Sequence, residues 1–301
     1  MLTPRARGLG AALRDARLEA HYGLRELSRR VGVNPALVSN WELGQRVPNP
    51  EDVAGILGAL GVTGEKKAWI MSLARGAAGP GWFTPGPQGS PTHFTTLVAH
   101  ERAARSMTVW APLMIPDLLQ IPDYAGFACS TELADASALQ ENVDKRMQRK
   151  GVLFGAKVIR ADMFIAVEAL RNHFGDDDVM LRQLRFITDV MVMSRTITVR
   201  VVPSEAASTS VLGGAFTLCR MKDRSSVVYC PHHGVGVFLV DEQAAPYLEV
   251  MDRLAKMALS PAKSLHRLEA EADQLVRALE AQRQANDASL VEILAGEERA
   301  D

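Results

Sequence analysis

The amino-acid sequence predicts a mainly α-helical chain: a five-helix N-terminal domain, then an α+β C-terminal domain with helices around a small antiparallel sheet. Three observations support this. Helical periodicity runs through residues 1–76, Gly and Pro crowd a predicted linker at 77–92, and short strand-like runs interrupt the helical stretches of 93–285. The chain has 301 residues, 47% of them hydrophobic, which is enough for two cores. We expect residues 286–301 to form a frayed C-terminal tail.

The helices of the N-terminal domain are predicted at about residues 5–21, 24–31, 34–43, 51–60 and 64–75. The connection between the second and third is too tight to be an ordinary loop. Gly32 directly follows the apolar stripe of the second helix and lets that helix end in a left-handed turn. Asn34 and Pro35 then suit the N-cap and the first position of the third helix.

The third predicted helix has an apolar inner face formed by Val38 and Trp41. The residues left on its outside are small or carry an amide: Asn34, Ala36, Ser39 and Asn40. A short exposed helix of this composition fits the floor of a DNA major groove, where Asn makes paired hydrogen bonds to adenine. The alternative is two ordinary packed helices of an α-helical domain.

This region resembles the XRE-type helix-turn-helix of bacterial and phage repressors. The matching residues are Leu27-Ser28, Gly32-Val33, Val38-Ser39, Trp41-Glu42, Gly44 and Pro48. The resemblance implies a DNA-binding domain in which a structural ion pair between Arg17 and Glu42 joins the first helix to the third. It also implies contacts with the DNA backbone by Arg25, Gln45 and Arg46, which would position the protein without reading sequence. The alternative for each arginine is a solvated surface side chain.

Charge is unevenly distributed along the chain. Residues 1–78 carry 11 Lys/Arg and 7 Asp/Glu, whereas the remainder carries 23 and 28. This asymmetry suggests a basic, DNA-facing end on a neutral-to-acidic body. The three cysteines are scattered, and no N-terminal apolar segment or long apolar run is present. We therefore expect a cytoplasmic protein with reduced thiols.

The C-terminal domain resembles a domain of unknown function that is attached to XRE-type heads in a large family of actinobacterial, antitoxin-like regulators. The matching segments are residues 100–104, 115–121, 124–125, 146–149, 168–171, 183–184, 196–203, 216, 227–229 and 258–260. The chain departs at Asp117, where the family has Gly, and at Ile121, where it has Thr. A left-handed turn tolerates Asp, so we expect the local backbone to be kept.

Within this domain, the sequence predicts helices at residues 93–107, 137–150 and 178–193 and short strands at 199–202, 216–221, 227–230 and 235–240. The acidic trio Asp176-Asp177-Asp178 invites a metal-binding interpretation. Asp at a helix N-terminus is favourable without an ion, so we expect no metal. Two long amphipathic helices follow, at 242–259 and 262–285. The second has an apolar stripe that suits either packing on its own domain or a dimer seam.

The segment Cys230-Pro231-His232-His233 is a second candidate cluster. Zinc needs four well-spaced ligands, and no other Cys/His pair lies nearby in the sequence. A turn between strands is the better interpretation. A cysteine nucleophile would require a third group and an oxyanion site, which the sequence does not supply. We therefore expect neither an enzyme nor a bound cofactor.

Together these features predict a sequence-specific DNA-binding transcriptional regulator that acts on double-stranded DNA as a homodimer. The second resemblance implies regulation by a small partner protein. A different hypothesis is a repressor whose C-terminal domain holds a pocket for a small-molecule effector. A third is an adaptor with incidental affinity for DNA.

Overall fold

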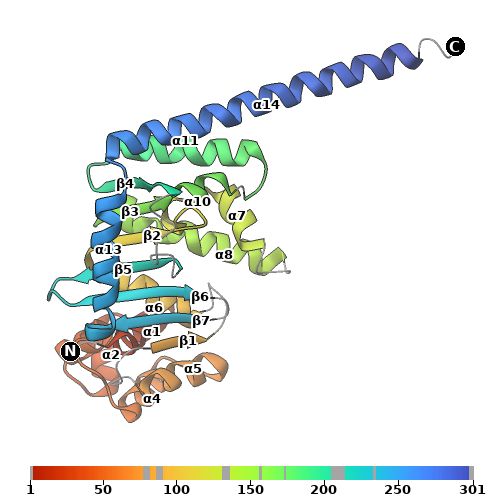
Figure 1. The fold of residues 1–301 in the computed structure, drawn as a ribbon. Helices are drawn as coiled ribbons and strands as arrows, with labels where there is room; N and C mark the ends of the chain where they lie inside the picture. The colour runs from red at the N-terminus through yellow and green to blue at the C-terminus, as the bar shows by residue number, and fades with distance from the viewer. Residues whose placement is uncertain are drawn as a thin grey trace. The chain divides into compact units, whose positions relative to one another are not determined.

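The computed structural model describes residues 3–76, 82–85, 91–130, 136–155, 158–172, 174–204, 214–232 and 235–297 (Figure 1). The chain forms two compact units, each assembled from separate segments. The first comprises Met1–Val109, Phe154–Ala161 and Gly214–Arg253, and the second comprises Trp110–Leu153, Asp162–Gly213 and Leu254–Asp301. The domain boundaries proposed from the sequence stay a prediction.

Five helices open the first unit, and we call them the head: α1 (Pro4–Glu19), α2 (Leu24–Val31), α3 (Pro35–Glu42), α4 (Pro50–Ala59) and α5 (Gly64–Ala74). Three of them begin at a side-chain cap, since Thr3, Asn34 and Asn49 each accept a hydrogen bond from a backbone amide of the following turn. The predicted five-helix fold is confirmed. Its core is apolar and includes Leu9, Leu13, Leu27, Val38, Trp41, Ile56, Leu57, Ile70 and Leu73.

Helix α1 is buried on more than one side. It packs against α3, α4 and α5 of the head and also against α6 (Pro91–Ala103), the first helix after the head. Its buried residues accordingly cover most of the helix circumference and include Ala6, Leu9, Ala12, Leu13 and Ala16.

The strands of the first unit form an ordered sheet, β1 (Trp82–Pro85), β7 (Val235–Val240), β6 (Ser226–His232), β5 (Phe216–Met221) and β2 (Ala104–Ala111). The antiparallel meander predicted for residues 199–202, 216–221, 227–230 and 235–240 is confirmed for its last three strands, β5, β6 and β7, with Val228 opposite both Leu218 and Leu239. It is wrong for residues 199–202, whose strand is not a neighbour of β5. Strand β7 buries alternate residues, as expected where one face of a strand meets a core. Strand β1 lies within the predicted linker and forms the edge of the sheet. Pro85 has no backbone N–H to donate, and an edge strand tolerates this because it has no second neighbouring strand.

Helix α6 packs through an aromatic cluster. The imidazole of His93 is hydrogen-bonded to the Tyr229 hydroxyl, and the Tyr229 and Phe238 ring centroids lie 5.0 Å apart. Two turns further along α6, His100 is buried with its ring centroid 5.3 Å from that of Phe238. Its Nδ1 donates to the backbone oxygen of Thr96 at 2.7 Å.

Two local predictions for this unit are wrong. Helix α6 ends at Ala103 rather than near residue 107, because Met107, Val109 and Trp110 are buried in strand β2. Residues 230–232 belong to strand β6 rather than to a turn. Residues 233–234, where a turn would lie, fall outside the described residues.

The second unit contains a short 3₁₀ turn η1 (Asp117–Leu119), all of strand β3 (Arg160–Ala166) except its first two residues, the strand β4 (Ile197–Val202) that pairs with β3, and several helices. The helices are α7 (Pro122–Ser130), α8 (Ala136–Arg149), α9 (Gly151–Phe154), α10 (Val167–Arg171), α11 (Asp177–Met193) and α14 (Pro261–Glu297). In the first unit, a 3₁₀ turn η2 (Asp241–Gln243) follows β7, and helix α13 (Ala245–Met257) begins there and ends in the second unit, ahead of α14.

Helix α14 packs on its own unit. It runs beside α11 and contacts β4, and it buries Leu268, Ala272 and Leu275 (Figure 1). Packing on its own domain is therefore the better of the two interpretations of this apolar stripe. The helix continues to Glu297, and the frayed tail expected from residue 286 stays a prediction. Residues 286–295 contain neither Gly nor Pro, and helix propagation there meets no breaker.

Candidate nucleic-acid interface

Helix α3 is held by a tight connection to α2. Gly32 has φ of 73°, in the left-handed region that suits glycine, and the Val33 amide donates to the Ser28 carbonyl at 3.0 Å. Val38 and Trp41 are 1% and 4% exposed and fasten the inner face of α3 to the head. The outer face of α3 remains accessible.

The predicted base-reading residues occupy this outer face to different degrees. Asn34 and Ala36 are exposed, whereas Ser39 and Asn40 are half-buried. Asn34 Oδ1 already accepts a hydrogen bond from the Ala36 amide at 2.8 Å. This cap bond uses one of the two lone pairs of Oδ1 and holds the Asn34 side chain at the start of α3, so Asn34 is less free than Asn40 to turn its donor and acceptor functions toward adenine. Asn40 retains both functions in the described hydrogen-bond network.

The predicted phosphate-contacting residues are exposed. Arg25 lies in the first turn of α2, and Gln45 and Arg46 follow the end of α3. The amides of Gln45 and Arg46 both donate to the Asn40 carbonyl, at 2.8 and 3.3 Å. These bonds fix the backbone after α3 and leave the two side chains free to extend.

Arg17 and Glu42 form a buried ion pair between α1 and α3. Arg17 Nε lies 2.6 Å from Glu42 Oε1, and Arg17 Nη2 lies 2.8 Å from Oε2. The side chains are 9% and 6% exposed. The hydrogen bond to Glu42 raises the pKa of Arg17, against the opposing effect of burial. Because both carboxylate oxygens are engaged, Glu42 has a structural role although it lies on α3.

Helix α2 carries two further basic residues, Arg29 and Arg30, for which the sequence predicted no role. Arg29 is exposed. Arg30 bonds to the Tyr22 hydroxyl and lies 5.3 Å from the centre of the Tyr22 ring, which ties it to the segment before α2. The sequence feature that could have identified Arg29 was the Arg29-Arg30 pair, which lies at an exposed polar end of a helix.

In the second unit, Asp117 is part of a buried network. Arg149 Nη1 lies 2.9 Å from Asp117 Oδ2, and Arg146 Nη1 lies 3.4 Å from Oδ1. Arg146 also donates to Gln120 Oε1 at 3.0 Å. Asp117 begins the 3₁₀ turn η1 and has a negative φ, so the left-handed turn proposed from the sequence is wrong at this position.

Gln183 of α11 completes this network from the other side. Its Oε1 accepts from the Ile121 amide at 2.7 Å, and its Nε2 donates to the Leu119 carbonyl at 2.8 Å. The proline-led segment that the family resemblance singled out is therefore held by buried polar side chains. Within this fold, Asp117 supplies the carboxylate for two buried arginines.

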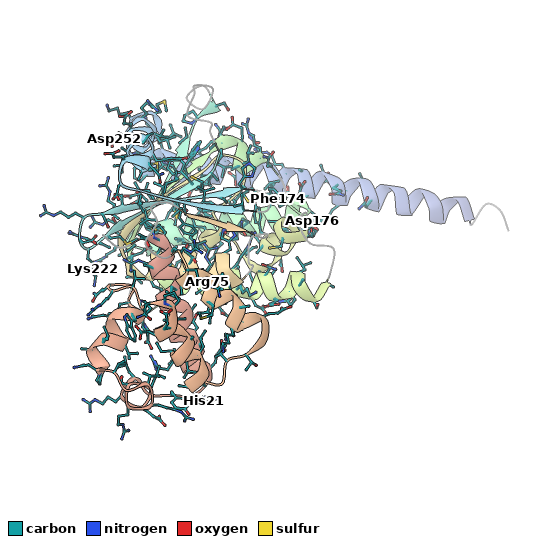
Figure 2. All side chains as sticks on the ribbon, turned by 90° about the horizontal axis from the view of Figure 1, so that it is seen from below. His21, Arg75, Phe174, Asp176, Lys222 and Asp252 are labelled. Atoms are coloured by element: carbon teal, nitrogen blue, oxygen red, sulfur yellow. The ribbon has the colours of Figure 1, made fainter. Side chains whose placement is uncertain are left out.

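The acidic trio lies at the start of α11. Asp176 accepts a hydrogen bond from the Val179 amide at 2.8 Å and caps the helix, and Asp178 lies 2.9 Å from Arg182 Nε (Figure 2 labels Asp176). Across the described residues, no group of three or more His, Cys, Asp or Glu side chains is arranged to hold a metal ion.

Comparisons with known proteins agree with this layout. Residues 8–70 match a helix-turn-helix domain family, and residues 94–270 match a domain of unknown function (DUF5753). No curated protein and no solved structure matches the chain. Among the helices that the structure describes, none is long and apolar enough to cross a membrane. The helix-turn-helix match supports a DNA-binding transcriptional regulator. With well over half of its residues inside the second match, the chain belongs to the DUF5753 family and carries a helix-turn-helix domain at its N-terminus.

Proposed function

We propose that this protein binds specific operators by placing α3 in the DNA major groove. The observation that carries the proposal is the division of α3 into two faces. Its inner face is fixed by Val38, Trp41 and the Arg17–Glu42 ion pair, and its outer face presents small and amide side chains. Asn40, with an uncommitted amide, is the principal base-reading residue. Ala36 and Ser39 leave room for the base edges.

Arg25, Gln45 and Arg46 contact phosphates in this proposal and set the position of the head on the duplex. Their exposure on both sides of α3 supports this assignment. We add Arg29 to the phosphate-contacting set because it is an exposed cation on the same helix as Arg25.

A single head of this size contacts few base pairs, so we propose a homodimer on an inverted repeat with half-sites about 34 Å apart. Leu43 and Val47, directly after α3, are 46% and 41% exposed. Apolar side chains beside a recognition helix provide a surface for a second copy of the head.

Regulation enters through the C-terminal region, and we propose a small partner protein as the regulator of this cytoplasmic, antitoxin-like factor. The resemblance to regulators of that kind supports the partner. A small-molecule effector is the second candidate. We propose binding rather than enzymatic catalysis as the activity.

The experiment is fluorescence anisotropy of the full-length protein on DNA from upstream of its own gene and on scrambled DNA of equal length, over a salt series. A preference for the upstream DNA that persists at physiological salt supports a specific autoregulator. Equal, steeply salt-dependent binding to both duplexes would contradict sequence-specific binding at this operator. Sedimentation of the complex gives the number of protein chains per duplex and tests the dimer.

A further inference from the structure

A basic hollow lies in the first unit. Its volume is about 620 Å³, and its lining residues are Arg105, Ser106, Arg160, Arg220, Met221 and Arg224. We call this site the arginine hollow. Four of its six residues are arginines, and all four are exposed, whereas Met221 is buried.

These arginines are far apart in the sequence and converge through the sheet. Arg105 lies on β2, Arg160 begins β3, and Arg220 lies near the end of β5. Strand β2 is the neighbour of β5 in the sheet, and Arg105, Arg160 and Arg220 all belong to the first unit.

Arg224 reaches the hollow from the turn between β5 and β6, which also carries Lys222 (Figure 2). The turn is closed by the Met221 amide, which donates to the Ser225 carbonyl at 2.9 Å. Arg224 has φ of 70°, a left-handed conformation that glycine normally supplies in hairpin loops of this length. An arginine held in a strained backbone conformation at the rim of a site is typical of a functional position.

The charge of the hollow is not neutralised by its surroundings. Within the described ranges, no carboxylate forms a salt bridge with any of the four arginines. The nearest carboxylate of the turn, that of Asp223, is engaged by Ser225 through both the amide at 3.0 Å and the hydroxyl at 2.6 Å. It also interacts electrostatically with Arg7 of α1. Four converging guanidinium groups repel one another unless an anion lies between them.

We propose that the arginine hollow binds a small molecule carrying two or more phosphate groups. Guanidinium groups recognise phosphate through paired, charge-assisted hydrogen bonds, and several of them around one space suit a di- or triphosphate better than a single carboxylate. The volume lies within the range of small-ligand sites, and Met221 provides an apolar floor for the rest of the molecule. The concave form favours a compact ligand over duplex DNA. This inference does not depend on the operator binding proposed above.

Isothermal titration of the full-length protein with sodium pyrophosphate and with tripolyphosphate tests the proposal, at constant ionic strength and with sulfate as a control anion. We expect both phosphates to bind more tightly than sulfate. The variant R105Q/R220Q should lose at least about tenfold in affinity, the effect of about 1.4 kcal/mol. The matched control R195Q/R253Q removes the same charge from exposed arginines outside the hollow and should bind like the wild type.

Arg224→Gly is a second variant, which should lose pyrophosphate binding without unfolding. Glycine relieves the strained backbone, so we expect a higher melting temperature together with weaker pyrophosphate binding. Equal pyrophosphate affinity in the wild type and R105Q/R220Q would overturn the proposal. The proposal would also be overturned if the wild-type protein did not bind pyrophosphate and R105Q/R220Q bound scrambled duplex DNA more weakly than the wild type. The arginines would then contact the DNA backbone.

Discussion

Gly10 of α1 lies so close to α3 that a Cβ at this position would fall 2.4 Å from the carbonyl oxygen of Trp41. It would also fall 2.8 Å from the carbonyl oxygen of Glu42 and 2.9 Å from the amide nitrogen of Gly44. All three atoms are backbone atoms and cannot move aside independently. The end of the proposed recognition helix therefore rests directly on the backbone of α1.

Gly10→Ala should destabilise the protein by about 1–3 kcal/mol, because the added methyl group forces α1 and α3 apart. The measurement is urea unfolding followed by circular dichroism. Gly55→Ala is the matched control: Gly55 lies within α4, and a Cβ there meets nothing within 4 Å. It should stabilise the helix by about 0.5–1 kcal/mol. Equal effects of the two substitutions would contradict close backbone packing at Gly10.

Glu42→Ala should cost about 3–5 kcal/mol, because the charge of Arg17 stays buried without its partner. Unfolding by urea at neutral pH measures the loss. Replacing both residues, as Arg17→Met with Glu42→Leu, should recover part of it. Glu26→Ala, at an exposed position of α2, should change stability by no more than about 1 kcal/mol. A Glu42→Ala effect as small as that of Glu26→Ala would show that the ion pair is dispensable.

Asn40→Ala should relax discrimination at one base position, reducing the preference for the correct base by about 1–3 kcal/mol. The measurement is anisotropy on a set of duplexes that differ at single positions of the operator. Affinity for scrambled DNA should stay unchanged. An equal loss on operator and scrambled DNA would assign Asn40 to the backbone instead.

Arg46→Ala should weaken binding to all duplexes by a similar factor and lower the salt slope by about one. The measurement repeats the salt series on operator and scrambled DNA. Arg75, an exposed arginine just after α5, provides the control (Figure 2). Arg75→Ala should leave both affinity and slope unchanged, and a base-specific loss in Arg46→Ala would contradict a phosphate contact.

The free energy of unfolding should fall as the solution is acidified, because folding buries His100 in its neutral form. Burial lowers the pKa of His100 from its ordinary value of 6.5 to about 3, although the hydrogen bond to Thr96 partly opposes the shift. The unfolded chain therefore takes up a proton below about pH 6.5 that the folded chain refuses until near pH 3. The stability that depends on buried, neutral His100 is fully present above about pH 6.5. It is lost as pH falls from about 6.5 toward 3, at about 1.4 kcal/mol per pH unit.

Urea unfolding at pH 7.5 and pH 5.5 measures this effect, and His100→Gln should show a smaller loss on acidification by about 1.4 kcal/mol. His266→Gln is the control, since the side chain of His266 is 80% exposed. An unchanged pH dependence in His100→Gln would assign the acid sensitivity to other groups.

The head could be predicted closely because its signals are local. Gly32, Asn34-Pro35 and the spacing of Leu27 and Val31 each act within one or two turns, so helix ends follow from neighbouring residues. The meander of β5 to β7 was equally accessible, since its strands are consecutive and separated by short turns.

Strands β2 and β3 were missed for the opposite reason. Met107, Val109 and Trp110 form a strand because distant segments flank them, and the helical periodicity of α6 conceals the change at Ala104. The arginine hollow depends on those same strands. Arg105, Arg160 and Arg220 are each an unremarkable surface residue until the sheet assembles, so no pattern along the chain could have grouped them.

One side of helix α1 packs against the rest of the head, and another side packs against α6. A fragment cut after α5 would carry into water an apolar face that α6 normally covers, so we expect such a fragment to aggregate or to bind DNA poorly. Exchange of heads among family members meets the same constraint, because a transplanted α1 must fit the α6 of its new host. We therefore expect that the two regions that match separate families are not interchangeable parts.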